Sequence, residues 1–121
     1  MSKLINLIWT PERHEDSRRK IVDVSSRVKL FTIADVDGLK LGNHYHERTP
    51  ESFYTLDGRI HFKLEDIQTK EKQEYVLESG QGISMPLFVA HLLIPERGAR
   101  FIGILGTDFD PTDLNKYEII W

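Results

Sequence analysis

Apolar and polar residues alternate over short runs along most of the chain, and apolar residues rarely recur at helical spacing. Alternation with a period of two is typical of strands that bury one face. The runs are separated by turn-forming segments, among them Asp37-Gly38, Asp57-Gly58 and Ser79-Gly80-Gln81-Gly82. Short strands with such turns about every 8–12 residues predict an all-β sandwich or barrel.

The runs place ten expected strands along the sequence. Their ranges are 3–9, 20–25, 27–34, 38–46, 51–56, 59–66, 73–78, 82–86, 89–94 and 99–106. Residues 11–19 (PERHEDSRR) are too charged and unpatterned for a strand, so we predict an exposed loop there. Asp57-Gly58 favours a type I′ turn, which predicts an antiparallel hairpin between 51–56 and 59–65.

The chain has 121 residues, of which 40% are hydrophobic, and carries a net charge of -3. This length suits one domain over 1–121, with a core at about 20–106. The acidic tail at 107–121 is expected to wrap the outside or to add an edge strand. The net charge provides no field that would attract nucleic acid or an acidic membrane. Because there is no cysteine, disulfides and thiolate catalysis are excluded.

The sequence also bears on the cellular location and the oligomeric state of the protein. No apolar run approaches the roughly 20 residues of a membrane helix, and the N-terminus lacks the pattern of a secretory signal. We therefore expect a cytoplasmic protein. A barrel this small leaves sheet edges and aromatic residues such as Phe31, Tyr54 and Trp121 that need cover, which predicts a homodimer.

Three potential metal ligands lie within eight residues: His44, His46 and Glu51. Residues two apart on a strand share a face, so the two imidazoles project together. Pro50 breaks the strand, and Glu51 can approach from the next one. Two imidazoles and a carboxylate on one face suit Zn, Fe, Ni, Mn or Co.

Two further histidines are candidates. His91 lies in an otherwise apolar strand, where it is either a fourth ligand or a hydrogen-bonded core residue. His61 alternates with large apolar neighbours, so it is expected to point away from them, to solvent or into a cavity mouth. The run from Asp108 to Asp113 superficially suggests a calcium loop, but it lacks the glycine and the distal glutamate of one.

The glycines around these residues carry a family resemblance. Gly38-x5-His44-x-His46-x4-Glu51-x6-Gly58 resembles the first signature motif of the cupin superfamily at every defined position. Gly80-x5-Pro86-x4-His91 resembles the second, with Phe88 in place of the usual glycine and Pro95 in place of an asparagine. The resemblance implies a single-domain jelly-roll barrel, the double-stranded β-helix of cupins. It also implies one divalent transition metal held by His44, His46, Glu51 and His91.

The local sequence narrows the resemblance. Gly42-Asn43-His44-Tyr45-His46, followed by Glu51-Ser52-Phe53, is similar to the cupin domain of capsular-polysaccharide sugar-nucleotide enzymes. The resemblance implies epimerisation of a 4-keto nucleotide sugar. Sugar-nucleotide 3,4-ketoisomerases are a second similar family, but their arginine and lysine around the histidine pair are replaced here by Leu41 and Glu47.

The implied reaction removes a proton next to a ketone and passes through a metal-stabilised enolate. The sequence supplies no unambiguous base, and the candidates are His61 and a metal-bound hydroxide. An iron-dependent dioxygenase and a non-enzymatic binding protein for a small molecule remain open, because cupins run many chemistries on one fold.

Overall fold

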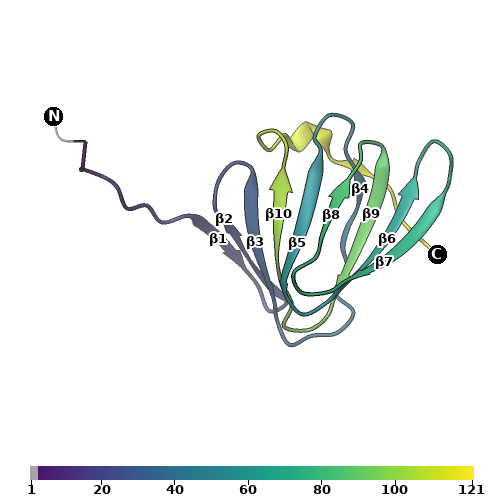
Figure 1. The fold of residues 1–121 in the computed structure, drawn as a ribbon, viewed down its shortest axis with the longest axis horizontal. Helices are drawn as coiled ribbons and strands as arrows, with labels where there is room; N and C mark the ends of the chain where they lie inside the picture. The colour runs from purple at the N-terminus through teal and green to yellow at the C-terminus, as the bar shows by residue number, and fades with distance from the viewer. Residues whose placement is uncertain (1–2) are drawn as a thin grey trace.

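The computed structural model describes residues 3–121, whose strands form two antiparallel sheets (Figure 1). The first sheet contains, in spatial order, β1 (Glu12–Glu15), β2 (Arg19–Asp23), β3 (Val28–Ile33), β10 (Arg100–Leu105), β5 (Glu51–Asp57) and β8 (Gly82–Met85). The second contains β11 (Asn115–Lys116), β4 (Leu41–Tyr45), β9 (Val89–Pro95), β6 (Ile60–Asp66) and β7 (Lys72–Leu77). A 3-10 turn at Pro111–Asp113 is the one helical element that the described residues contain. None of their helices could span a membrane.

The core lies between the two sheets and follows the predicted alternation. On β6, Ile60 and Phe62 are fully buried, whereas His61 and Lys63 between and after them face the opposite side and stay partly exposed. Both sheets contribute to one apolar cluster, which contains Ile33, Leu39, Phe53, Ile60, Phe62, Leu77, Met85, Leu93, Ala99 and Phe101. The expected all-β class is therefore confirmed, and the expected strands from 20–25 to 99–106 are present with ends shifted by a few residues.

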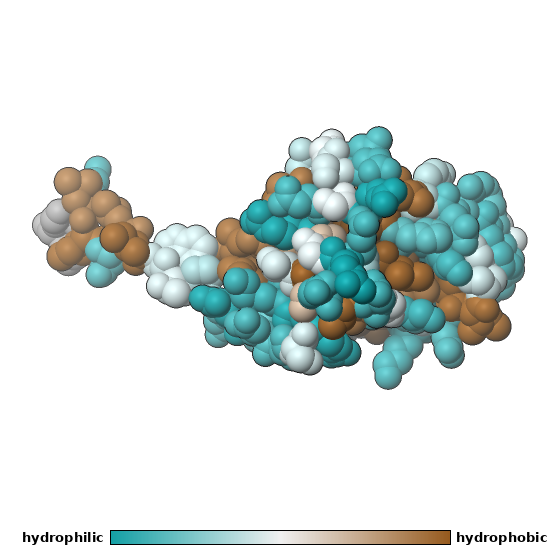
Figure 2. All heavy atoms as spheres, turned by 90° about the horizontal axis from the view of Figure 1, so that it is seen from below, coloured by the Kyte–Doolittle hydropathy of each residue, from teal (hydrophilic) through white to brown (hydrophobic). Residues whose placement is uncertain are grey.

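The expected strand at 3–9 is wrong. These residues lie outside both sheets and extend away from the body of the molecule (Figures 1 and 2). Ile8 is 94% exposed and Trp9 is 60% exposed. Alternation favours a strand only where a neighbouring strand accepts its backbone hydrogen bonds, and no strand of the described chain pairs with this segment.

The expected loop at 11–19 is also wrong. Glu12–Glu15 forms β1, which pairs antiparallel with β2, so that Glu12 lies opposite Asp23 and His14 opposite Ile21. All four residues of β1 are exposed. A strand at a sheet edge requires backbone pairing but no buried face, and charged side chains suit such an edge.

The expected hairpin about Asp57-Gly58 does not form. β5 pairs with β10 and β8 in the first sheet, whereas β6 pairs with β7 and β9 in the second. Gly58 has a φ of 80°, but Asp57 is not among the residues with positive φ, and a type I′ turn requires both. The segment is therefore a connection between the sheets.

The C-terminal tail, residues 107–121, both adds an edge strand and packs on the outside of a sheet. β11 adds an edge strand by pairing with β4, placing Asn115 opposite Tyr45 and Lys116 opposite His44. Beyond β11, Ile119 and Trp121 pack with Ala90 and Leu92 of β9 in a second, smaller apolar cluster. Figure 1 shows the tail in yellow: after β10 it crosses above β10 and β5, and then reaches β4.

Candidate metal centre

The structure brings His44, His46, Glu51 and His91 together, with one potential ligand atom of each within 4.8 Å of all the others. Glu51 begins β5 of the first sheet, whereas the histidines come from β4, the residue after β4, and β9 of the second sheet. His44 and His91 lie opposite each other in the β4–β9 register, with ring centroids 4.6 Å apart. The cluster thus spans the gap between the two sheets.

A bulge in β4 sets the positions of the two histidines on this strand. The register with β9 shifts between Gly42 and His44, and Asn43 adopts a φ of 58°. Asn43 is the extra residue of this bulge, since Gly42 lies opposite Leu92 and His44 lies opposite His91. The bulge directs the side chain of His44 toward the space between the sheets. The C-terminal segment covers the bulge: the backbone N–H of Ile119 donates to Oδ1 of Asn43 at 3.1 Å.

Gly42 permits a close approach of β4 to β9. A Cβ atom at this position would lie 2.6 Å from the carbonyl oxygen of His91, and the φ of Gly42 is 97°. We expect Gly42→Ala to push the two ligand-bearing strands apart and to lower the free energy of unfolding by about 1–3 kcal/mol through overpacking.

Gly38→Ala is the matched control for this substitution. Gly38 also has a positive φ, 73°, but a Cβ there would meet nothing within 4 Å. It shares the backbone strain of Gly42→Ala without the crowding. Equal losses in chemical denaturation of the two variants would contradict the role of Gly42 as a contact point between the strands.

The charge state of the cluster follows from its surroundings. Burial, together with the charges of His91 and His46, lowers the pKa of His44 to about 4, so its imidazole is neutral at pH 7. Burial alone would raise the pKa of Glu51, but His46, through its hydrogen bond and charge, and His91, through its close contact and charge, outweigh burial and lower this pKa to about 2. A neutral imidazole and an ionised carboxylate are the forms that bind metals.

His46 is oriented from outside the cluster. Its Nδ1 donates a hydrogen bond to the backbone carbonyl of Asp113 at 2.8 Å, and its Nε2 lies 3.3 Å from Oε1 of Glu51. Burial lowers the pKa of His46, but the bonds to Glu51 and Asp113 outweigh it and raise this pKa. Because the carbonyl fixes the proton on Nδ1, Nε2 is the nitrogen that faces the cluster.

His91 provides the test of whether a metal fits. The residue is 1% exposed, and its Nε2 lies 3.2 Å from Oε1 of Glu51. The contact lacks the alignment of a hydrogen bond, so this buried nitrogen has no hydrogen-bond partner among residues 3–121. A buried polar atom without a partner is costly, and a metal ion among the four side chains would satisfy it. Three imidazoles and one carboxylate are a donor set for a divalent transition metal, so the residues fit the expected group.

Two cavities reach the cluster. One, of about 230 Å³, is lined by His44, His46 and Glu51 together with Phe109 and Leu114 of the C-terminal segment, among others. The other, of about 280 Å³, is lined by His44, Glu51 and His91 and has apolar walls that include Phe53 and Phe101. A larger cavity of about 440 Å³ lies beside β7 and β8 and contains no cluster residue. Small molecules can therefore approach the four side chains.

His61 is not brought to the cluster. It lies on the outer face of β6, where its Nε2 is 3.7 Å from Oε2 of Glu74 on β7, and its side chain is 39% exposed. It lines neither cavity that reaches the cluster. The proposed role of His61 as a base stays a prediction that this geometry does not support.

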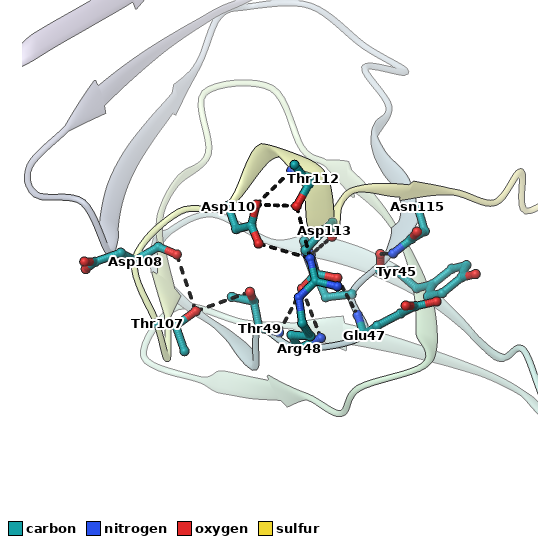
Figure 3. Close-up of polar contacts among 11 residues, drawn as sticks. Tyr45, Glu47, Arg48, Thr49, Thr107, Asp108, Asp110, Thr112, Asp113 and Asn115 are labelled. Atoms are coloured by element: carbon teal, nitrogen blue, oxygen red, sulfur yellow. Dashed lines mark hydrogen bonds and ion pairs between the residues drawn. The ribbon is translucent and has the colours of Figure 1, made fainter.

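Asp113 is a functional candidate that sequence reasoning missed. It is 1% exposed, and its carboxylate accepts hydrogen bonds from the backbone N–H groups of Glu47 at 2.8 Å, Arg48 at 3.0 Å and Thr49 at 2.9 Å (Figure 3). These donors form the loop between His46 and Glu51. Burial raises the pKa of Asp113, but the N–H groups outweigh it and lower this pKa. The acidic run 108–113 was the available signal, and it suggested only a calcium loop.

Comparison with known proteins agrees with the fold. The model of the family described as "Polysaccharide biosynthesis C-terminal domain" matches residues 12–104. No curated protein matches the chain in sequence. Among solved structures, the capsular polysaccharide assembling protein CapF of Staphylococcus aureus superposes with a TM-score of 0.79 at 18% identity. That match covers 94% of this chain but only 33% of CapF, so the chain spans about a third of that protein.

Two further solved structures share the fold. The 3,4-ketoisomerase QdtA of Thermoanaerobacterium thermosaccharolyticum, crystallised with TDP, gives a TM-score of 0.66 at 18% identity and covers 87% of this chain and 82% of its own. Oxalate decarboxylase OxdC of Bacillus subtilis gives a TM-score of 0.71 at 13% identity and covers 88% and 30%. With the family model matching most of its length, the chain belongs to the polysaccharide biosynthesis C-terminal domain family and has the cupin fold.

Proposed function

We propose that the chain is a metal-dependent epimerase or isomerase of a keto nucleotide sugar in polysaccharide or deoxysugar biosynthesis. The observation that carries the proposal is the cluster of three histidines and Glu51, in which a buried His91 nitrogen lacks a hydrogen bond beside two accessible cavities. The family description supports the pathway class. QdtA, a structural neighbour, has been crystallised with TDP-4-keto-6-deoxyglucose.

His44, His46, Glu51 and His91 would hold one Zn, Fe, Ni, Mn or Co ion. Such an ion supplies Lewis-acid stabilisation of the negative charge that develops on a carbonyl oxygen. In the reaction, a base takes the proton from the carbon next to the ketone, and the bonding electron pair moves to that oxygen to give an enolate. Return of the proton to the other face completes an epimerisation.

Residues around the cluster would support this proton removal by excluding water and by holding His46 in place. Phe53 and Phe101 line the cavity beside His44 and His91 and limit the water that reaches the reacting atoms. Exclusion of water strengthens the electrostatic stabilisation of the enolate. The hydrogen bond from His46 to the Asp113 carbonyl holds the imidazole in place, so no reorganisation of this side chain is needed during the reaction.

The test is exchange of a carbon-bound proton with solvent. TDP-4-keto-6-deoxyglucose incubated in heavy water with the metal-loaded protein is expected to gain deuterium at C3 or C5, measured by NMR. His46→Ala is expected to lower the exchange rate by roughly 10³-fold or more, because Lewis-acid stabilisation contributes several kcal/mol. His61→Gln is measured alongside, since only a base at this position would make its exchange rate fall.

The alternatives give different results in the same assay. Three histidines and a carboxylate also suit iron, and an iron-dependent dioxygenase would consume oxygen without solvent exchange. A protein that only binds a small molecule would do neither. Absence of deuterium across a panel of nucleotide-linked 4-keto sugars would overturn the proposed function.

A further inference from the structure

Arg19 stands apart from the other arginines of the chain. Arg13, Arg18, Arg27, Arg48, Arg59, Arg97 and Arg100 all form ion pairs with aspartate or glutamate. The backbone N–H of Arg19 donates to Oδ1 of Asp16 at 3.1 Å, but its guanidinium forms no hydrogen bond or ion pair with any residue in 3–121. It is also only partly exposed. A half-buried guanidinium without a protein partner is a free binding group for an anion.

The free guanidinium belongs to the cavity that reaches the metal cluster. Arg19 lines the cavity of about 280 Å³ together with His44, Glu51 and His91. Lys29 and Lys40 line it as well, and Lys40 forms no ion pair within the described chain. Lys29 has a long ion pair of 3.8 Å with Asp23. Glu51 is the acidic residue of this lining, and its carboxylate faces the histidines.

This concentration of positive charge is local. The whole chain carries a net charge of -3. Three cationic side chains nevertheless converge on one cavity, from β2, β3 and the residue before β4. A ligand with a single carboxylate would need only one of these three cations to neutralise its charge. A diphosphate carries two to three negative charges and presents oxygens to several donors at once, so it matches the lining better.

We infer that this cavity is a diphosphate-binding subsite anchored by Arg19, with Lys29 and Lys40 at its sides. The inference deepens the proposed function and rests on it for the identity of the ligand as a nucleotide sugar. Because Arg19 and the cluster line one cavity, a ligand held by its diphosphate can extend its sugar ring toward His44 and His91. The apolar wall, including Phe53 and Phe101, would contact the non-polar face of that ring.

The experiment measures binding, not turnover. Uridine diphosphate, thymidine diphosphate, pyrophosphate and malonate are titrated calorimetrically into the full chain, with and without bound metal. Arg19→Met, which keeps the length of the side chain, is expected to weaken diphosphate binding by roughly 10- to 100-fold, the loss typical of a charge-assisted hydrogen-bond pair. Arg19→Lys is expected to recover part of it, and higher salt to weaken wild-type binding.

Arg59→Met is the matched control. Arg59 pairs with Glu96 and lies outside both cavities that reach the cluster, so this variant is expected to bind diphosphate like the wild type. Metal content and melting temperature of Arg19→Met are measured to establish that its loss is specific to the anion. Binding of the nucleoside diphosphates and of pyrophosphate in the wild type, and its loss in Arg19→Met, would support the subsite.

The remaining outcomes separate the subsite from the function. Equal affinity of wild type and Arg19→Met for every diphosphate, or binding of malonate but of no diphosphate, would overturn the subsite. If diphosphate binding depends on Arg19 but no 4-keto sugar exchanges its proton, the subsite stands and the proposed function falls. If exchange occurs with the same KM in Arg19→Met, the function stands and the subsite falls.

Discussion

Replacing His44 and His46 together by alanine is expected to abolish metal binding. The wild-type chain, loaded with a divalent transition metal and freed of excess, is expected to hold one ion. The double variant loses two of the four side chains whose ligand atoms lie within 4.8 Å of one another. The remaining pair, Glu51 and His91, cannot complete the coordination that tight binding requires. Elemental analysis of both proteins measures the effect directly.

His91→Gln tests the same centre at one position. His91 is the residue whose buried Nε2 lacks a hydrogen bond, so a metal that satisfies it should also stabilise the fold. Metal loading is expected to raise the melting temperature of the wild type, since a ligand that binds only the folded state stabilises it. The shift is expected to be small or absent in His91→Gln and in the double variant.

His61→Gln provides the control for metal content. His61 lies on the outer face of β6 near Glu74, so this variant is expected to bind one ion per chain like the wild type. Equal metal content in the wild type and in the His44→Ala/His46→Ala variant would show that the four side chains are not a metal centre.

The four cluster residues could be predicted because their signals are local. His44 and His46 share a face by strand parity, and fixed glycine and proline spacings mark both cupin-like motifs. The structure brings these residues together as the resemblance implies, with His91 opposite His44. Alternation likewise located most strands, since burial of one face acts within a few residues of sequence.

The errors arise where a neighbouring strand, and not the side-chain pattern of the segment itself, decides what the segment forms. Nothing near Asp57-Gly58 indicates that β5 and β6 belong to different sheets. The sheet of each strand depends on its pairing partners, which are β10 and β8 for β5, and β7 and β9 for β6. The charged β1 forms because it can pair with the edge of β2. Residues 3–9 form no strand because no strand among the described residues pairs with them. Backbone pairing of this kind leaves no periodic signal in the sequence of the segment itself.

Asp113 illustrates the same limit at the site. Its three hydrogen-bond donors are more than 60 residues away in sequence, with separations of 66, 65 and 64 residues. Local sequence shows an acidic run, but only the folded chain shows that one of its members organises the loop between two metal-ligand candidates. The neighbouring Asp110 instead accepts from Thr112 at the start of the 3-10 turn and pairs with exposed Arg48.

We therefore expect Asp113→Asn to weaken metal binding while leaving all four ligand side chains in place. The amide keeps the size of the carboxylate but has one acceptor oxygen, so at least one of the N–H groups of Glu47, Arg48 and Thr49 loses its partner. A lost buried hydrogen bond costs about 1–3 kcal/mol of unfolding free energy. The loop then no longer fixes His46, whose Nδ1 donates to the Asp113 carbonyl. Loss of such outer contacts typically lowers metal affinity by roughly 10- to 100-fold.

Asp110→Asn separates this effect from a general loosening of the C-terminal segment. Asp110 contacts Arg48 and Thr112 at the surface, and an exposed ion pair of this kind is worth about 1 kcal/mol or less. We expect Asp110→Asn to keep wild-type metal affinity, measured by competition with a chelator at a temperature where both variants are folded. If Asp113→Asn also kept wild-type affinity, its carboxylate would stabilise the loop without positioning His46. Because the backbone carbonyl that accepts from His46 belongs to the same residue as the carboxylate, a shift of one should displace the other.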